Sequence, residues 1–396
     1  MKAIAAVMLM LASVLLSCKG GGSNVNLPKT DSLAILRKLD SIRVEIKASK
    51  KHREIKAVVD RKIANGFNGN IIVSQRGVVL FDTCVGYANF EKKIPNTPNS
   101  AFQLASLSKT FTSAAVMLLV EKGQLNLNNT VQDYYPEFPY SGVTLRSLLS
   151  HRSGLPYYEY VFDVKTRSEK LYPNNQDMMR WFSETKPAPK IHNLPDHYFG
   201  YNNTNFAILA AIVEKVSKKD FAHFLEEEIF KPLGMNSSFA ATQLNDSLLT
   251  KNRTFGYQYN RRIAFDQYDN ILGDKGVFST ISDLLKWDRA LKSNVLLNKE
   301  SLREMYTPRS FEHPGLRNYG YGFRLWLNEK QQTDYVYHTG WWKGYNTIMF
   351  MDLRDDFVII VLSNRYNKDV YHIKEIIDIV HGGKKETSVQ ENILDE

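Results

Sequence analysis

The sequence reads Phe102-Gln103-Leu104-Ala105-Ser106-Leu107-Ser108-Lys109 and then continues into the apolar run 110–120, which stops shortly before Gly123. Such a run, with a glycine just beyond its end, predicts a buried helix. Ser106 would lie in the first turn of that helix, where free backbone N–H groups and the helix dipole stabilise a developing anion. Lys109 would lie one turn further on, on the same face. The stretch therefore predicts a serine nucleophile with a lysine beside it that can exchange its proton.

A second Ser-x-x-Lys string, Ser183-Glu184-Thr185-Lys186, has a different context. It follows the helix-like run 178–182 and leads straight into Pro187 and Pro189, so it marks the end of a helix and the start of a loop. Short strings of this kind also occur by chance in a long chain. We therefore expect no catalytic role for Ser183.

Two later strings would complete a site of this kind: Tyr201-Asn202-Asn203 and His338-Thr339-Gly340. The first stands just before the helix-like run 206–213 and would provide a base or proton relay. The second would provide a wall for the acyl group of a substrate. Each string alone is weak evidence, because a lone tyrosine among aromatic neighbours is usually a core residue and a lone histidine is usually structural. Their order and context together favour a catalytic role.

Strand-like segments stand at both ends of the region that holds these motifs, with helical patterns between them. The stretch 69–81 predicts a hairpin that turns at Gln75-Arg76-Gly77. Further strands are expected at 319–328, 335–338, 345–352 and 357–363, and a closing helix at 368–381. The sequence thus predicts an α+β (α/β) fold, in which both ends of the domain build one antiparallel sheet flanked by helices and a mostly helical region is inserted. We place this domain at residues 63–383, before a polar tail at 384–396.

The first residues indicate export from a bacterial cell. Met1-Lys2 carries one positive charge, the stretch 3–17 is apolar or small, and Cys18 follows. The pattern is typical of a secretory signal, and the small residue before the cysteine resembles a lipoprotein cleavage site. We expect a signal peptide at 1–18, a lipid on Cys18 that anchors the protein in a membrane, and a flexible tether at 19–30. The protein would then be an exported lipoprotein of the periplasm, outer membrane or cell surface. A plain signal peptide or an uncleaved anchor are the alternatives.

The net charge of +9 is concentrated near the N-terminus. Between Lys29 and Lys62 there are eleven Lys or Arg against five Asp or Glu, and apolar residues recur at helical spacing. We expect a basic amphipathic helical segment at 31–62, which is either a solvated face or a contact with anionic lipid or envelope polymer. No nucleic-acid partner is expected, because the body of the chain is close to neutral. Cys84 would be the only cysteine besides Cys18, and its strand-like context favours a core role.

The motifs and their order resemble the serine beta-lactamase and penicillin-binding protein superfamily, in particular its class C-like branch of esterases and peptidases. The resemblance spans about residues 65–383. Besides the three strings, it rests on Gly86-Tyr87-Ala88-Asn89, Leu148-Leu149-Ser150-His151-Arg152-Ser153-Gly154-Leu155-Pro156 and Gly276-Val277-Phe278-Ser279-Thr280.

The resemblance implies a catalytic set of Ser106, Lys109 and Tyr201. Ser106 would attack a carbonyl carbon and form an acyl-enzyme, while Lys109 and Tyr201 exchange the proton. The backbone N–H groups of Ser106 and Trp341 would form the oxyanion hole. The substrate-binding residues would be Asn203, His338, Thr339, Gly340 and Trp341. No cofactor and no metal ion is expected.

The third string departs from the family pattern at its first residue, because many members carry a lysine where this chain has His338. A histidine is mostly neutral near pH 7, so it would hold a substrate carboxylate weakly or in a pH-dependent way. We therefore expect an acyl-serine hydrolase of a small ester, amide or peptide in the cell envelope, similar to an esterase, a D-aminopeptidase or a DD-peptidase. The alternatives are a beta-lactamase and a non-catalytic lipoprotein that binds muropeptide. The oligomeric state is left open.

Overall fold

A computed structural model describes residues 41, 44–162, 172–241, 252–312 and 315–383. The chain divides into two compact units, Met1–Ala48 and Ser49–Glu396, and the second contains every element described below. The expected signal peptide, lipid on Cys18, tether and polar tail lie outside the described residues. Residues 31–40, 42 and 43 of the expected basic segment also lie outside them.

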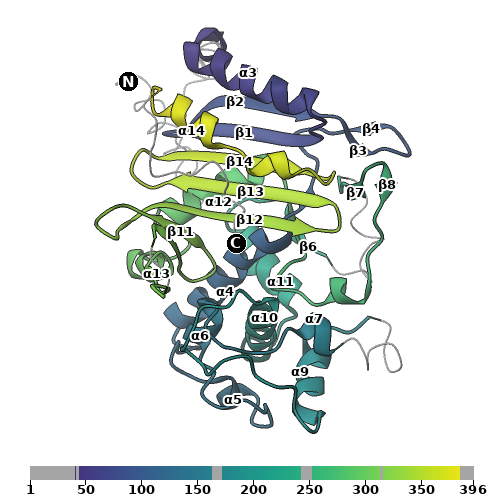
Figure 1. Ribbon diagram of the computed structural model, residues 1–396, viewed down its shortest axis with the longest axis vertical. Coiled ribbons are helices and arrows are strands. Elements are labelled where there is room, and N and C mark those ends of the chain that lie inside the picture. Colours follow the sequence, from purple (N-terminus) through teal and green to yellow (C-terminus); the bar gives the residue numbers. More distant parts are fainter. Residues whose placement is uncertain (1–40, 42–43, 163–171, 242–251, 313–314, 384–396) are drawn as a thin grey trace, which may run out of the picture. The chain divides into compact units, whose positions relative to one another are not determined.

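One antiparallel sheet of seven strands organises the second unit, in the order β10-β11-β12-β13-β14-β1-β2 (Figure 1). Its strands are β1 (Gly69–Gln75), β2 (Val78–Val85), β10 (Arg317–Tyr319), β11 (Arg324–Leu327), β12 (Thr333–Trp342), β13 (Tyr345–Asp352) and β14 (Phe357–Ser363). Strand β1 pairs with β14 from Gly69 opposite Ser363 to Gln75 opposite Phe357. This pairing joins the two ends of the domain, and the predicted fold is confirmed.

The alternation of side chains along β14 shows how the two faces of the sheet are used. Ile359 and Val361 face a hydrophobic cluster formed with helices α3 (Lys50–Ala64) and α14 (Lys374–Val380). Ile360 and Leu362 belong to the larger cluster formed with the helical region. All seven residues of β14 are buried, which is why this strand reads as a continuous apolar run.

Helix α3 belongs to the packed unit, although the sequence placed it in a basic segment that ends at residue 62. The unit begins at Ser49, whose side chain caps the helix, and Ile55 and Val59 are fully buried. Two of its lysines bind other parts of the fold. Lys51 Nζ donates to the carbonyl of Val380 at the end of α14 (2.6 Å), and buried Lys62 donates to the carbonyls of two residues, Asp369 (2.7 Å) and His372 (2.8 Å). Part of the basic charge therefore stabilises helix ends instead of facing an anionic partner.

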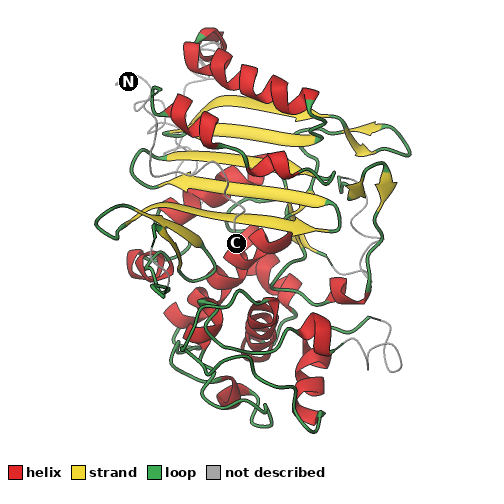
Figure 2. Cartoon of the chain, in the orientation of Figure 1, coloured by secondary structure: helices red, strands yellow, loops and turns green. Residues whose placement is uncertain are grey.

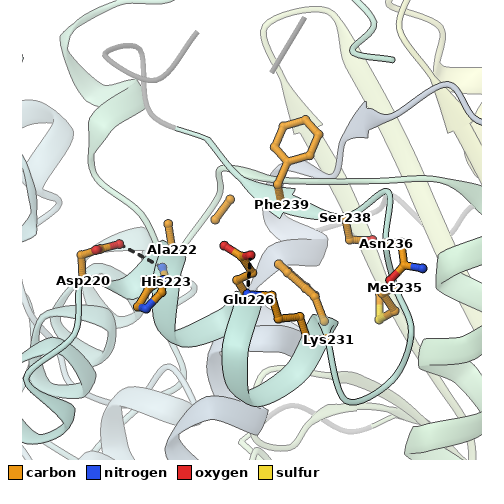
Figure 3. A pocket seen from close by; sticks show the side chains of 11 residues that line it. Asp220, Ala222, His223, Glu226, Lys231, Met235, Asn236, Ser238 and Phe239 are labelled. Atoms are coloured by element: carbon orange, nitrogen blue, oxygen red, sulfur yellow. Dashed lines mark hydrogen bonds and ion pairs between the residues drawn. The ribbon is translucent and has the colours of Figure 1, made fainter. Parts of the chain in front are cut away.

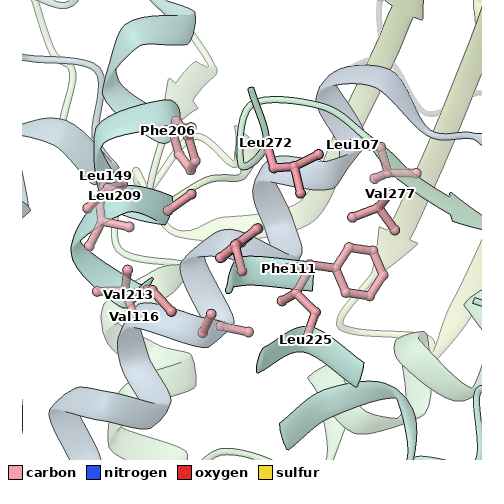
Figure 4. Close-up of a cluster of buried hydrophobic side chains, with 14 of the residues drawn as sticks. Leu107, Phe111, Val116, Leu149, Phe206, Leu209, Val213, Leu225, Leu272 and Val277 are labelled. Carbon is pink, nitrogen blue, oxygen red and sulfur yellow. The ribbon is translucent and has the colours of Figure 1, made fainter. Parts of the chain in front are cut away.

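The inserted region is mainly helical and lies beside the sheet (Figure 2). Its helices are α4 (Lys109–Glu121), α5 (Val131–Tyr134), α6 (Leu145–Leu149), α7 (Tyr158–Val161), α9 (Asn175–Glu184), α10 (Asn203–Ser217), α11 (Phe221–Leu225), α12 (Ile281–Lys292) and α13 (Lys299–Met305). Helices α4 and α10 are apolar nearly all round and form the centre of the larger cluster, where Phe111, Val116, Phe206 and Val213 meet (Figure 4). A helix without a polar face must be enclosed by other elements, and residues 110–119 of the predicted run are all buried.

A short second sheet holds the segments that lead to the catalytic motifs. Its order is β5 (Phe102–Gln103), β9 (Val277–Ser279) and β6 (Phe239–Ala240). The remaining short strands are β3 (Tyr87–Asn89), β4 (Ile94–Pro95), β7 (Tyr257–Gln258) and β8 (Arg261–Arg262). The expected closing helix is interrupted, because a 3₁₀ turn, η5 (Lys368–Tyr371), precedes α14. A π-helical turn, η2 (Glu226–Phe230), follows α11.

Candidate active site

Ser106 lies in a 3₁₀ turn, η1 (Ala105–Ser108), that leads directly into α4. The sequence had placed it in the first turn of the α-helix itself. The difference arises at Ala105, whose φ of 51° is left-handed, a conformation that costs energy for a residue with a Cβ atom. The main chain just before Ala105 is fixed from both directions, because Leu104 N–H donates to the carbonyl of Val277 (2.8 Å) and the Leu104 carbonyl accepts from the Thr347 hydroxyl (2.7 Å).

Lys109 is fully buried at the start of α4, and its ammonium nitrogen lies among three oxygens. Nζ is 3.0 Å from Ser106 Oγ, 2.8 Å from Asn203 Oδ1 and 2.9 Å from the backbone carbonyl oxygen of Asp274. None of the three belongs to a carboxylate. Two of them, the amide oxygen and the backbone oxygen, can only accept hydrogen bonds. If Lys109 is neutral, these two take its two hydrogens and its lone pair points toward Ser106. This geometry suits a general base.

Tyr201 completes the predicted catalytic set. The ring centroid lies 5.0 Å from Lys109 Nζ and 5.3 Å from the guanidinium carbon of Arg324, so two cations flank the ring. The side chain is partly exposed, unlike that of Lys109. The structure therefore brings Ser106, Lys109 and Tyr201 together in one place.

The middle residue of the second string explains why the three residues are consecutive. Asn202 is the N-cap of α10: its side-chain oxygen accepts from Thr204 N–H (2.9 Å), and its amide donates to the carbonyl of Leu155 (2.6 Å). A capped helix start fixes the residues on both sides of the cap. Tyr201 before it and Asn203 after it are thereby held toward Lys109. The sequence reasoning gave Asn202 no role.

His151 supports this arrangement and is fully buried. Its Nδ1 accepts from the backbone N–H of Asn202 (3.1 Å) and from the side-chain amide of Asn205 (3.1 Å), and its ring packs against that of Tyr201 with centroids 4.3 Å apart. Burial first, and then the positive charge of Lys109, hold the pKa of His151 well below its ordinary value. A neutral ring that accepts at Nδ1 acts as a positioning group for the start of α10.

Gly340 lets strand β12 pass beside the nucleophile turn. A Cβ atom built at this position would lie 2.1 Å from the carbonyl oxygen of Leu104 and 3.1 Å from the Cβ of Ala105. The glycine of the third string is therefore needed for close approach of two backbones.

His338 is buried, and both of its ring nitrogens are engaged. Nδ1 lies 2.6 Å from the carbonyl oxygen of Thr339, which can only accept, so Nδ1 carries the hydrogen. Nε2 is then an acceptor and receives the hydroxyl of Tyr319 at 3.1 Å. Burial, followed by Arg324 and Lys109, holds the pKa of His338 well below its ordinary value. The side chain offers a substrate neither a charge nor a free nitrogen.

The other predicted residues of β12 differ in exposure. Thr339 is largely buried, whereas the side chain of Trp341 is 64% exposed and its ring meets that of Tyr366 at a centroid distance of 6.3 Å. Strand β11 pairs with β12 only as far as Arg324 opposite Tyr337, so within the described residues the later part of β12 pairs only with β13. That leaves one strand edge beside Ser106 for a substrate backbone. The oxyanion hole of Ser106 and Trp341 N–H groups stays a prediction.

Lys343, a possible replacement for the missing cation of the third string, is paired with the carboxylate of Asp266. The preceding Trp342 donates its indole N–H to Asp269 (2.7 Å). These contacts hold the turn after β12 against the segment 266–275. The Lys343 charge is therefore already neutralised by a partner.

Two residues near the site were not predicted from the sequence. Arg324 opens β11 and lies beside Tyr201, and no sequence pattern points to it, because its place opposite Tyr337 depends on the pairing of β11 with β12. Glu159 lies on α7, and its Oε1 accepts from Asn203 Nδ2 at 2.6 Å. It stands just after the 148–156 string, but its contact with Asn203 depends on how distant segments pack.

A cavity of about 540 Å³ lies elsewhere, on α11, η2 and β6 (Figure 3). Its polar lining residues include Asp220, His223, Glu226 and Lys231, and none of the residues of the predicted site lines it. Within the described ranges, no group of three His, Cys, Asp or Glu side chains could hold a metal ion. No helix in the same ranges has the length and apolar character needed to cross a bilayer.

The chain is similar in sequence to known proteins. The chain is 33% identical over 320 residues to penicillin-binding protein 4* of Bacillus subtilis (strain 168), an alignment that covers 77% of this chain and 70% of that protein. It is 25% identical over 368 residues to the putative penicillin-binding protein PbpX of the same strain, covering 87% of this chain and 84% of that protein.

Solved structures share the fold at lower identity. A penicillin-binding protein homologue from Pyrococcus abyssi has a TM-score of 0.72 at 24% identity and covers 86% of this chain and 79% of its own. FmtA from Staphylococcus aureus has a TM-score of 0.70 at 23% identity, with 85% and 89% covered. A family model described as Beta-lactamase matches residues 55–382. This chain therefore belongs to the beta-lactamase family, and its two B. subtilis relatives carry the name of penicillin-binding proteins.

Proposed function

We propose that this protein is a serine hydrolase that forms an acyl-enzyme on Ser106 with small ester, amide or peptide substrates. The observation that carries the proposal is the buried nitrogen of Lys109, 3.0 Å from Ser106 Oγ and held by two further oxygens. A buried lysine whose neighbours in the described residues include no carboxylate is costly to the fold, so its presence beside a serine supports a chemical role.

The proposed reaction has two steps. In the first, Ser106 Oγ attacks the carbonyl carbon, Lys109 takes the hydroxyl proton, and the proton passes by way of Tyr201 to the leaving alcohol or amine. In the second, water attacks the acyl-serine, gives its proton to the same base, and Ser106 regains its hydroxyl hydrogen as the acid product leaves. The backbone N–H groups of Ser106 and Trp341 would bind the oxyanion in both steps.

Arg324 supports a substrate that carries a carboxylate. It supplies a permanent positive charge 5.3 Å from the ring of Tyr201, whereas His338 is held neutral by burial. The names of the B. subtilis relatives, penicillin-binding proteins, point in the same direction. Among the expected substrates, a peptide with a free C-terminal carboxylate is therefore favoured over a neutral ester.

We further propose that the protein acts in the cell envelope, anchored by a lipid on Cys18. This rests on the N-terminal pattern of one charge, an apolar stretch and a cysteine. Metabolic labelling with a lipid precursor, in the natural chain and in Cys18→Ser, tests it. Equal labelling of both would contradict the anchor.

Active-site labelling tests the reaction. A fluorophosphonate probe is expected to modify the soluble form of the protein at Ser106, located by peptide mass analysis, and to leave Ser106→Ala unmodified. Ser183→Ala is the matched control, because Ser183 opens the other Ser-x-x-Lys string and its hydroxyl donates to the carbonyl of Met179 in its own helix (3.1 Å). It should label like the natural chain. Absence of any adduct that depends on Ser106 would rule the proposal out.

A further inference from the structure

Glu159 connects to the catalytic lysine through a single side chain. Its Oε1 accepts a hydrogen bond from Asn203 Nδ2 (2.6 Å), and Asn203 Oδ1 accepts from Lys109 Nζ (2.8 Å). The one-turn helix that carries Glu159 is held in place, because the Tyr268 hydroxyl donates to the Glu159 backbone carbonyl (2.7 Å). The second carboxylate oxygen, Oε2, is buried and has no hydrogen-bond partner within the described residues.

The chemistry of the two neighbours fixes the orientation of the Asn203 amide. An ionised carboxylate only accepts hydrogen bonds, and a lysine ammonium only donates them. The amide has one end of each kind, so only one orientation satisfies both neighbours: nitrogen toward Glu159 and oxygen toward Lys109. In the opposite orientation, the Asn203 amide oxygen would face a carboxylate oxygen, and neither can donate a hydrogen bond. Without the carboxylate, this unfavourable contact would disappear.

The orientation matters for the reaction because it decides where the lone pair of a neutral Lys109 points. With the amide oxygen toward Lys109, the lysine hydrogens go to Asn203 and to the Asp274 carbonyl, and the lone pair is left for Ser106. With the amide nitrogen toward Lys109, an N–H group would compete with Ser106 for that lone pair. We propose that Glu159 is a positioning residue, which orients Asn203 and thereby aims Lys109 at Ser106. The proposal rests on the proposed function.

The other charged groups nearby do not take over this role. The Asp274 carboxylate is occupied by Lys275 Nζ (3.1 Å) and by the hydroxyl of Tyr158 (3.2 Å), and only its backbone carbonyl contacts Lys109. Lys275 in turn donates to the Tyr158 hydroxyl and lies 5.0 Å from the ring centroid of Trp342. Glu159 is thus the carboxylate that faces the Asn203 amide.

An exchange of the two functional groups separates positioning from simple structural support. In Glu159→Gln, the new amide at position 159 can both donate and accept, so it no longer fixes the orientation of the Asn203 amide. In Asn203→Asp two carboxylates face each other. In the double variant, the new carboxylate at position 203 accepts from both Lys109 and the new amide at position 159, so a single hydrogen-bond direction is restored with the net charge of the natural chain. Glu137→Gln, at an exposed position, is the control for loss of one negative charge.

The measurement is the rate of fluorophosphonate labelling at saturation together with the probe concentration that gives half of that rate. For Glu159→Gln we expect the saturating rate to fall about 10- to 100-fold, as for a misaligned base, with the half-saturating concentration within about twofold. The saturating rate of Asn203→Asp should fall at least as far, and the double variant should label about tenfold faster than Asn203→Asp. Glu137→Gln should match the natural chain. Glu159→Asp, which keeps the charge but withdraws the oxygen, should be slow as well. It also serves as the second test if Glu159→Gln fails to fold in a thermal melt.

Three results would overturn the inference. The first is a saturating rate of the natural level in Glu159→Gln. The second is a loss in that variant that lies only in the half-saturating concentration. The third is a double variant no faster than Asn203→Asp, because a residue with a merely structural role cannot be rescued by reversing a hydrogen bond. If the natural chain itself gives no Ser106 adduct, the proposed function fails and the positioning role fails with it. A labelled natural chain with an unaffected Glu159→Gln overturns the positioning role alone.

Discussion

Gly340 lies so close to the nucleophile turn that a Cβ atom there would come within 2.1 Å of the carbonyl oxygen of Leu104. No contact this short is tolerated, and the atom on the other side is backbone, which cannot rotate away. Strand β12 or the turn η1 would have to move, and η1 carries Ser106.

Gly340→Ala is therefore expected to impair both stability and reaction. Overpacking of a filled site costs about 1–3 kcal/mol of the free energy of unfolding, and the shift of η1 should slow fluorophosphonate labelling of Ser106 by about tenfold or more. Urea unfolding and labelling rates measure the two effects. Gly200→Ala is the matched control, because a Cβ atom at exposed Gly200 meets nothing within 4 Å. A Gly340→Ala variant with the stability and the labelling rate of the natural chain would contradict the close approach of β12 to η1.

Lys109→Met should separate function from stability. The side chain is fully buried and contacts no carboxylate in the described part of the chain, so an apolar side chain of similar length removes a buried polar group from the core. We expect labelling to fall by about 10²- to 10⁴-fold, the usual contribution of a general base, while the melting temperature stays equal or rises. Lys186→Met, the same change in the second Ser-x-x-Lys string, should leave both unchanged. A large loss of stability in Lys109→Met would mean that Lys109 mainly supports the fold.

The sequence predicted the parts of this site that depend on neighbours along the chain. Ser106 and Lys109 are three residues apart, and an apolar run directly after them is enough to predict a buried helix. The sheet was also predictable, because the strands at both ends show clear apolar patterns. The break in the closing helix and the 3₁₀ turn at Ser106 were missed, since left-handed Ala105 is held by segments far away in the sequence.

The contacts between distant segments were out of reach for the same reason. Arg324 meets Tyr201 only because β11 pairs with β12, and Glu159 meets Asn203 only because α7 lies against the start of α10. The expectation that His338 holds a substrate group depended on where its nitrogens point. That direction is set by Tyr319 and the carbonyl of Thr339, which no short pattern reveals.

Two buried histidines should make the protein less stable in mild acid. The pKa values of His151 and His338 in the folded protein lie well below the ordinary value, which the unfolded chain regains. Below about pH 6.5 the unfolded chain thus binds protons that the folded chain does not. The free energy of unfolding should then fall as the pH is lowered, by up to about 1.4 kcal/mol per pH unit for each histidine.

His338→Gln should reduce this pH dependence, because glutamine can donate to the Thr339 carbonyl and accept from Tyr319 without titrating. Urea unfolding at pH 7.5, 6.5 and 5.5 measures the slope, and it should become shallower than in the natural chain. His192→Gln, at an exposed position, should keep the natural slope. An unchanged slope in His338→Gln would show that His338 is already protonated in the fold.

Arg324 should determine the preference for a substrate carboxylate. A hydrogen-bonded ionic contact contributes about 1.5–3 kcal/mol, so Arg324→Gln is expected to lower kcat/KM about 10- to 100-fold for a D-alanyl-D-alanine peptide with a free C-terminus. The same peptide with a terminal amide should lose little, because it brings no charge to the guanidinium. Arg289→Gln, an exposed position on α12, should treat both peptides like the natural chain. Equal losses for the free and the amidated peptide would mean that Arg324 acts on Tyr201 and His338 alone, and the carboxylate would have to be bound elsewhere on the strand edge.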